Sequence, residues 1–311
     1  MSSFVILVDA ASNVNNELKE RFDIQEVIKG GLTFPDGTSY DVTSDFDIIS
    51  IDEFYNQLKN KKAKFTTAAP SPEVFTSYFK KYLKDGKDVM IFTLSSALSS
   101  TYQYACVAAN ELNEKYENKV VVIDSLAYSA SELLLVIQAS NLRKQGLSVF
   151  EVKEKIEEIK KHLHQAGPMD DLMFLARSGR ISNGKAFMGT LVGVNPIGEV
   201  NNEGLTKVLC KVKGSKKALK VSLEYIKRTI INPEEQIILV ANSNRKEKAE
   251  EFIEMIKNEI NPKEIISVDV GLFCAPNIGP GLCAAYYLGK EKSIDLSIET
   301  AIFAEIIQTL K

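Results

Sequence analysis

The sequence predicts an α/β protein with two domains, in which an N-terminal parallel sheet flanked by helices is followed by a C-terminal α+β domain. Short apolar runs alternate with amphipathic segments in the first half, a hairpin signal appears in the second, and 311 residues suit two domains. The pattern changes at AGPMDD (166–171). We therefore expect domains at 1–168 and 169–290, followed by an additional amphipathic helix at 291–311.

The first half reads as buried strands separated by helices. Three apolar runs have the length and composition of strands buried on both faces: 4–8, 89–94 and 120–124. Amphipathic spacing predicts helices at 52–61, 71–86, 99–116, 129–145 and 149–163. The helix from 71 has Ser71 as its expected N-cap and Pro72 at its first position. This order predicts a parallel sheet covered by helices on both faces.

The second half mixes hairpin and helix signals. The turn Asn201-Asn202-Glu203-Gly204 between two apolar runs predicts a β-hairpin. Helices are expected at 183–194, 214–230 and 247–260, and strands at 236–243 and 265–271. Gly279-Pro280-Gly281 before LCAAYYLG is read as a turn from a strand into a helix. Ser297 is the expected N-cap of a last helix that packs on its own domain, with a dimer or partner contact as the alternative.

Charge and hydropathy argue against several classes of function. The formal net charge is −3 and the basic residues are scattered, so we expect no nucleic-acid partner. Asp9 interrupts the first apolar run and no basic residue precedes it, so this run is read as a strand rather than a signal peptide. The longest later run, 133–137, is too short to span a bilayer. A cytoplasmic protein without integral membrane association is expected.

The cysteines and histidines do not predict a metal site. Cys106, Cys210, Cys274 and Cys283 form no CxxC pair and are expected to be free, mostly buried thiols. His162 and His164 are expected on the surface, at the end of a charged helix. No paired carboxylates are recognisable, and no phosphate loop or Ser-His-Asp arrangement appears. We expect no catalytic residues, metal or cofactor.

Four stretches contain polar side chains at positions where a ligand could bind. Thr66 and Thr67 precede a helix start and are read as turn residues. Ser95 to Thr101 follow a buried strand and begin a helix, so anion binding there is as well supported as simple capping. Arg177 and Arg180 are read as structural, with phosphate binding as the alternative. The stretch 277–281 contains Gly281, which allows close approach of a ligand or of packed backbone.

Together these stretches resemble the DegV family, and in particular its fatty-acid-binding members of the FakB type. The resemblance covers about residues 4–290 and lies in five segments in register: Asp9-Ala10-Ala11, Thr67 to Ser71, Ser95 to Ala105, Ser178 to Ser182, and Ala275 to Gly281. It implies a non-enzymatic carrier holding one long-chain fatty acid between its domains. It also implies a partner fatty acid kinase that phosphorylates the bound carboxylate.

The resemblance assigns the fatty acid carboxylate to Thr67 and to Ser95 or Ser96, with Asn277 where the family has a histidine near the head group. Asn cannot carry charge, so we expect fatty acid binding to survive while presentation of an acyl phosphate is weakened or lost. Other departures are Ala68 and Ala69 beside Thr67, Lys213 in place of an arginine tied to kinase docking, and Ser131 and Leu133 in place of small glycines.

Two other readings stay open. The chain could be an enzyme or enzyme subunit acting on another small anion, which Arg177 and Arg180 would favour if they faced the ligand. It could also be a divergent family member whose pocket has collapsed and which acts through protein contacts, which the bulk of Leu133 motivates. An apolar tunnel would distinguish a lipid carrier from both.

Overall fold

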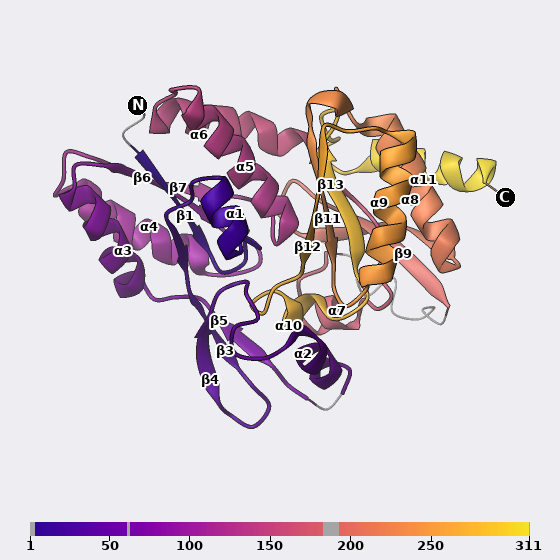
Figure 1. Ribbon diagram of the computed structural model, residues 1–311, viewed down its shortest axis with the longest axis horizontal. Helices are drawn as coiled ribbons and strands as arrows, with labels where there is room; N and C mark the ends of the chain where they lie inside the picture. Colours follow the sequence, from indigo (N-terminus) through magenta and orange to yellow (C-terminus); the bar gives the residue numbers. More distant parts are fainter. Residues whose placement is uncertain (1–3, 61–62, 183–192, 311) are drawn as a thin grey trace. The chain divides into compact units, whose positions relative to one another are not determined.

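The computed structural model describes residues 4–60, 63–182 and 193–310, which form two compact units (Figure 1). Unit 1 contains residues 4–48, 63–160 and 271–274, and unit 2 contains 49–60, 161–182, 193–270 and 275–310. The main division falls between Lys160 and Lys161, eight residues before the boundary expected at 168. In addition, residues 49–60 belong to unit 2 and residues 271–274 belong to unit 1.

The main sheet of unit 1 is parallel throughout, as predicted. Its strands are β2 (Glu26–Ile28), β1 (Phe4–Asp9), β6 (Asp88–Thr93) and β7 (Val120–Asp124), in that spatial order. Leu7 pairs with Ile91, and Ile91 pairs with Val122, so the three longest strands run in register. Helices cover both faces, which is why β1 reads as an uninterrupted apolar run.

The helices of unit 1 lie around this sheet (Figure 1). They are α1 (Asn16–Arg21), α3 (Pro72–Lys84), α4 (Thr101–Asn113), α5 (Ala130–Lys144) and α6 (Val149–Ile159). Helices α3 and α4 pack on each other and share a core with Leu7 and Ile91, while α5 packs with α6. Ser71 is the N-cap residue of α3, as predicted, but its side chain makes no capping hydrogen bond.

A second, antiparallel sheet in unit 1 was not predicted. It consists of β4 (Ser39–Val42), β3 (Gly30–Thr33) and β5 (Thr66–Ala68), with β3 in the middle. The interpretation of Thr66 and Thr67 as turn residues is therefore wrong. The strand was missed because it is three residues long and half exposed, so it shows no apolar run.

Unit 2 is built on a mixed sheet and a hairpin. The sheet order is β12 (Glu264–Asp269), β11 (Ile237–Asn242), β13 (Cys283–Leu288) and β8 (Leu163–Ala166), with only the β11–β12 pair parallel. The predicted hairpin is confirmed as β9 (Val194–Val200) and β10 (Thr206–Lys213). The predicted α/β plus α+β fold class is thereby confirmed.

The helices of unit 2 are α2 (Ile51–Leu58), α7 (Met173–Ser178), α8 (Ser215–Thr229), α9 (Lys246–Glu259), α10 (Ala275–Ile278) and α11 (Ser297–Thr309). Two short 3-10 helices span Lys160–His162, where the chain passes from unit 1 into unit 2, and Pro233–Glu235. Most of the helix predicted at 183–194 lies outside the described residues. Among the helices that the structure describes, none has the length and apolar character needed to cross a membrane.

Two predictions for the end of the chain need correction. The segment after Gly281 is the strand β13 rather than a helix; a run of small apolar residues buried between two neighbouring strands has no distinguishing period. Helix α11 has Leu296, not Ser297, at its N-cap. The preferred packing is confirmed, because α11 lies against α8 and β10, and Phe303 stacks on Tyr225 with ring centroids 4.1 Å apart.

Candidate ligand-binding site

The carboxyl ends of β1, β6 and β7 meet at one edge of the parallel sheet, called here the carboxyl edge of unit 1. The strands end at Asp9, Thr93 and Asp124, and the loops that follow carry several hydroxyl side chains. Those side chains belong to Ser12, Ser95, Ser96, Ser99, Ser100, Ser125 and Ser129. Ligands of open parallel sheets bind outside this edge, so the topology favours a site here.

Ser95 and Ser96 differ in what their side chains do. Ser95 is fully buried, and its Oγ accepts a hydrogen bond from the backbone N–H of Ala97 at 3.3 Å. The backbone N–H of Ser96 donates to Asp124 Oδ1 at 3.1 Å, and its half-buried side chain makes no hydrogen bond to another described residue. Ser95 thus fixes the loop, while the Ser96 hydroxyl remains available to a ligand.

The Asp9 carboxyl connects the ends of two strands. Its Oδ1 accepts from the N–H of Ala11 and its Oδ2 from the N–H of Leu94, both at 2.8 Å. Burial raises the pKa of Asp9 to about 6, although these two N–H groups act in the opposite direction. This carboxyl therefore orients the loop that begins with Leu94 and continues into Ser95.

A second carboxyl, that of Glu132 in the first turn of α5, lies next to Asp9. Glu132 is fully buried, and neither carboxyl oxygen has a hydrogen-bonding partner among the described residues. Burial, followed by the charge of Asp9 and a side-chain interaction with it, raises the pKa of Glu132 well above its usual value.

Paired carboxylates were not expected from the sequence, and the Asp9–Glu132 pair corrects that expectation. The two residues lie on β1 and on α5, far apart in the chain, so no local motif joins them. The available signal was a single acidic residue beside the apolar run LLLVI (133–137). A charge at the start of a helix that is buried almost all round usually needs a specific partner.

Thr67 lies on β5 with its side chain on the protected side of the small sheet. It pairs with Leu32, which is fully buried, whereas Thr66 pairs with Thr33 on the exposed side. Directly opposed residues of antiparallel strands share a face, so Thr67 and Leu32 point the same way. Thr67, Ser95 and Ser96 belong to unit 1, whereas Asn277 lies on α10 of unit 2.

The segment 271–274 completes this part of unit 1. The N–H of Leu272 donates to Ser44 O at 3.4 Å, and the Cys274 thiol donates to Ala11 O at 3.5 Å. Phe273 covers Gly30, where an added Cβ would come within 2.3 Å of the ring. An apolar ring and a fully buried thiol therefore lie beside the polar loops of the carboxyl edge.

The arginine-containing stretch looks structural, as expected. Gly179 ends α7 in the left-handed conformation, the Arg180 guanidinium donates to Ser178 O, and Ser182 donates twice to Thr206 O. The helix that Ser182 was expected to cap lies mostly outside the described residues. These contacts fix the stretch to β10 and give no support to phosphate binding.

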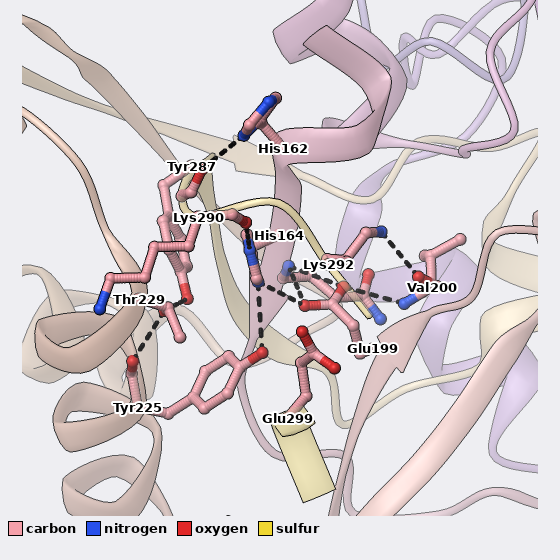
Figure 2. Close-up of polar contacts among 12 residues, drawn as sticks. His162, His164, Glu199, Val200, Tyr225, Thr229, Tyr287, Lys290, Lys292 and Glu299 are labelled. Carbon is pink, nitrogen blue, oxygen red and sulfur yellow. Dashed lines mark hydrogen bonds and ion pairs between the residues drawn. The ribbon is translucent and has the colours of Figure 1, made fainter. Parts of the chain in front are cut away.

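The expectation of surface histidines is wrong for His164. This residue lies on β8, is 1% exposed, and sits within a polar network of unit 2 (Figure 2). Its Nδ1 lies 3.1 Å from Glu199 Oε2 and 3.2 Å from the Tyr225 hydroxyl, and its Nε2 donates to Lys290 O at 2.7 Å. The polar sequence KHLHQAG looks exposed only because its partners are distant in the chain.

Glu199 is the centre of this network. Besides His164, it accepts from the N–H of Gln165 at 3.0 Å and from its own neighbour Val200 N–H at 2.9 Å. Lys292 is almost completely buried nearby and donates to Val200 O at 2.8 Å. Burial lowers the pKa of Lys292, and the charges of Glu199 and Glu299 oppose that shift. Each of these polar side chains has a partner, as a structural network requires.

The thiols are free, as predicted. Cys274 and Cys283 are buried, and Cys106 and Cys210 are half-buried. Burial raises the pKa of Cys210 and of Cys283 to about 12, so these thiols are poor nucleophiles at neutral pH. No group of three or more His, Cys, Asp or Glu side chains that could hold a metal occurs in the part of the chain that the structure describes.

Comparison with known proteins identifies the relatives of this chain. The model of the DegV family, described as uncharacterised, matches residues 3–290. A DegV domain-containing protein of Clostridium perfringens is 33% identical over 293 residues, which are 94% of this chain and 99% of that protein. One of Clostridium acetobutylicum is 30% identical over 294 residues, covering 93% and 100%.

Solved structures share the fold. A DegV family protein from Thermus thermophilus, whose structure is described as fatty acid binding, matches with a TM-score of 0.82 and 24% identity over 92% of this chain and 99% of that one. The fatty acid kinase B3 protein of Streptococcus pneumoniae, loaded with linoleic acid, matches with a TM-score of 0.77 and 20% identity over 93% and 99%. At these identities the likeness shows the fold.

Proposed function

Because the chain belongs to the DegV family, we propose that it binds one long-chain fatty acid and acts as a carrier rather than an enzyme. The main support is the carboxyl edge of unit 1, where the Ser96 hydroxyl makes no hydrogen bond within the described part of the chain and lies in a loop held by Asp9 and Asp124. Hydroxyl donors can bind a carboxylate without a full counter-charge. The solved relatives from Thermus thermophilus and Streptococcus pneumoniae are described with fatty acids.

In this proposal, Thr67 and Ser96 hold the fatty acid carboxylate. Both side chains are half-buried, and Ser96 is preferred over Ser95 because the Ser95 Oγ is buried and already accepts from Ala97. The acyl chain supplies most of the affinity, since each buried CH₂ contributes about 0.8 kcal/mol. Asn277 contributes a neutral amide in place of a charge.

Transfer of the bound acid to a partner fatty acid kinase is the second part of the proposal. A relative carries the name of such a kinase system, which supports it. Asn277 cannot neutralise an acyl phosphate, and Lys213 lacks the planar donor pair of an arginine. We therefore expect any transfer to a kinase to be weaker than fatty acid binding itself.

The test compares neighbouring hydroxyls. Purified protein is stripped of lipid, reloaded with palmitate and washed, and the retained acid is quantified for wild type, Thr67→Val and Ser96→Ala. Each variant should lose about tenfold or more in affinity for palmitate and therefore retain less of it, because one hydrogen bond to a charged group contributes about 1.5–3 kcal/mol.

Thr66→Val is the matched control, because Thr66 lies on the opposite, exposed side of the same strand and should retain palmitate like wild type. Unchanged retention in both test variants would disprove the head-group assignment. Failure of wild type to retain any fatty acid would favour a collapsed pocket or a different anionic ligand.

A further inference from the structure

Three polar atoms in one turn of unit 1 are buried without partners among the described residues. They are the two carboxyl oxygens of Glu132 and the Oγ of Ser129, the N-cap residue of α5. Ser129 also has a φ of 56°, an unusual backbone conformation for a residue with a side chain. Each unsatisfied buried group costs about 1–3 kcal/mol, so a cluster of them calls for a functional explanation.

The cluster is connected to the proposed head-group loop. Asp9, beside Glu132, accepts from the N–H of Leu94, which directly precedes Ser95 and Ser96. The N–H of Ser129 donates to Ala11 O at 2.9 Å, and that of Ser95 donates to Ala127 O at 2.9 Å. One continuous set of hydrogen bonds thus joins the start of α5 to the loop that carries Ser96.

We propose that Glu132 is a specificity-determining residue: together with Asp9 it holds a proton while a carboxylate ligand is bound, so that the ligand binds only together with that proton. The inference rests on the proposed function, because it concerns the head group of the bound fatty acid. In this role Glu132 limits the charge of the head group that the site accepts. The site would accept a carboxylate together with one proton, or a neutral polar head group.

The hydrogen bonds decide which carboxyl carries the proton. Asp9 accepts from two backbone N–H groups, which stabilise its ionised form, whereas Glu132 receives none. The proton therefore resides on Glu132 and the negative charge on Asp9. A ligand carboxylate adds a further negative charge to those of Asp9 and Asp124, and ionisation of Glu132 would add one more.

The surrounding groups offer no compensating positive charge. The groups that shift the pKa of Glu132 are Asp9 on β1 and Asp124 on β7, besides burial, and all raise it. Cys274 keeps its proton, because burial and then the carboxyl groups of Glu132 and Asp9 raise its pKa well above the usual value. None of the described groups acting on Asp9 or Glu132 is a cation.

The sign of the pH dependence follows from these charges. A bound carboxylate raises the pKa of Glu132 further, so the complex holds more protons than the free protein does. Affinity for a carboxylate is then full while Glu132 is protonated in the free protein, and it falls as the pH rises through the free-state pKa of Glu132. The limiting slope is about tenfold in affinity per pH unit for one linked proton.

The experiment measures the Kd of the delipidated full-length protein for palmitate and for hexadecanol between pH 6 and 9. Wild type should lose affinity for palmitate as the pH rises and keep a constant affinity for hexadecanol, which carries no charge. Glu132→Gln and Glu132→Met cannot ionise, so both should bind palmitate with little pH dependence and more tightly than wild type at pH 9. Glu154→Gln, an exposed substitution on α6, should behave like wild type.

The possible outcomes distinguish the role of Glu132 from fatty acid binding itself. Equal palmitate slopes for wild type and both Glu132 variants would overturn the role of Glu132 while leaving fatty acid binding intact. A slope for hexadecanol as steep as that for palmitate would also overturn it, because the effect would not depend on the charge of the ligand. If wild type binds neither ligand at any pH, the proposed function fails and this inference fails with it.

Discussion

Each unit buries a glutamate, and the two glutamates differ in the hydrogen-bonding partners and charges around them. Glu199 in unit 2 accepts hydrogen bonds from two backbone N–H groups and interacts with His164, with the buried Lys292 nearby (Figure 2). Glu132 in unit 1 is equally buried but has no partner within the described residues, and its nearest charged neighbour is another carboxylate. The difference separates a carboxylate that holds the fold together from one that is costly to the fold and available for a ligand-dependent role.

The largest effect should come from breaking the satisfied network. Glu199→Ala leaves the N–H groups of Gln165 and Val200 without acceptors and removes a countercharge from the buried Lys292. We expect a loss of about 3–5 kcal/mol in the free energy of unfolding, measured by urea denaturation. Glu203→Ala, in the exposed turn of the same hairpin, should change stability by less than about 0.5 kcal/mol. Similar values for the two variants would mean that the network contributes little.

A slightly smaller effect should follow from opening the apolar side of this network. Phe303 of α11 is fully buried and stacks on Tyr225, whose hydroxyl lies 3.2 Å from His164 Nδ1. Phe303→Ala should cost about 3–4 kcal/mol in unfolding free energy. Ile298→Ala, on the same helix but 60% exposed, should cost far less. Equal costs would indicate that α11 is not packed on its own unit in solution.

In unit 1 the two carboxyls should respond differently to loss of charge. Asp9→Asn places an amide donor against the N–H of Ala11 or Leu94 and should cost about 2 kcal/mol. Glu132→Gln keeps a donor that can face Asp9 and should change stability by less than about 1 kcal/mol at pH 5. Thermal and urea unfolding of both variants would measure this, and a larger loss for Glu132→Gln would show that Glu132 has a structural partner.

The same pair predicts how the stability difference depends on pH. The folded-state pKa of Glu132 is raised above its unfolded value, so its protonated form is favoured by folding. Its contribution is fully present below the unfolded pKa and is lost as the pH rises through the folded pKa. Relative to wild type, Glu132→Gln should therefore gain stability between pH 5 and 9. A constant difference across this range would contradict the raised pKa.

Much of the fold could be predicted because its signals are local. The runs at 4–8, 89–94 and 120–124 are strands buried on both faces, and Asn201 to Gly204 form the turn of a hairpin. The small sheet that contains β5 was not predicted, because its strands are short and partly exposed and their sequence shows no hydrophobic periodicity. The strand β13 was read as a helix because buried strands and buried helices share the same apolar composition.

The candidate site shows the same difference between local sequence signals and contacts that are distant in the chain. Thr67, Ser95 and Ser96 were assigned because their segments resemble motifs of the DegV family, and their roles as ligand residues stay predictions. The Asp9–Glu132 pair and the His164 network were missed because each joins residues that are distant in the chain. Only the folded chain shows that His164 has hydrogen-bonding partners, whereas the carboxyl oxygens of Glu132 have none within the ranges 4–60, 63–182 and 193–310.

Denaturing mass spectrometry of an organic extract from the purified full-length protein tests the central claim most directly. The account predicts a long-chain fatty acid at about one mole per mole of protein, and the dominant chain length would report the size of its pocket. An extract without fatty acid, together with no thermal shift when palmitate is added to the protein, would contradict the carrier function and leave only the DegV fold.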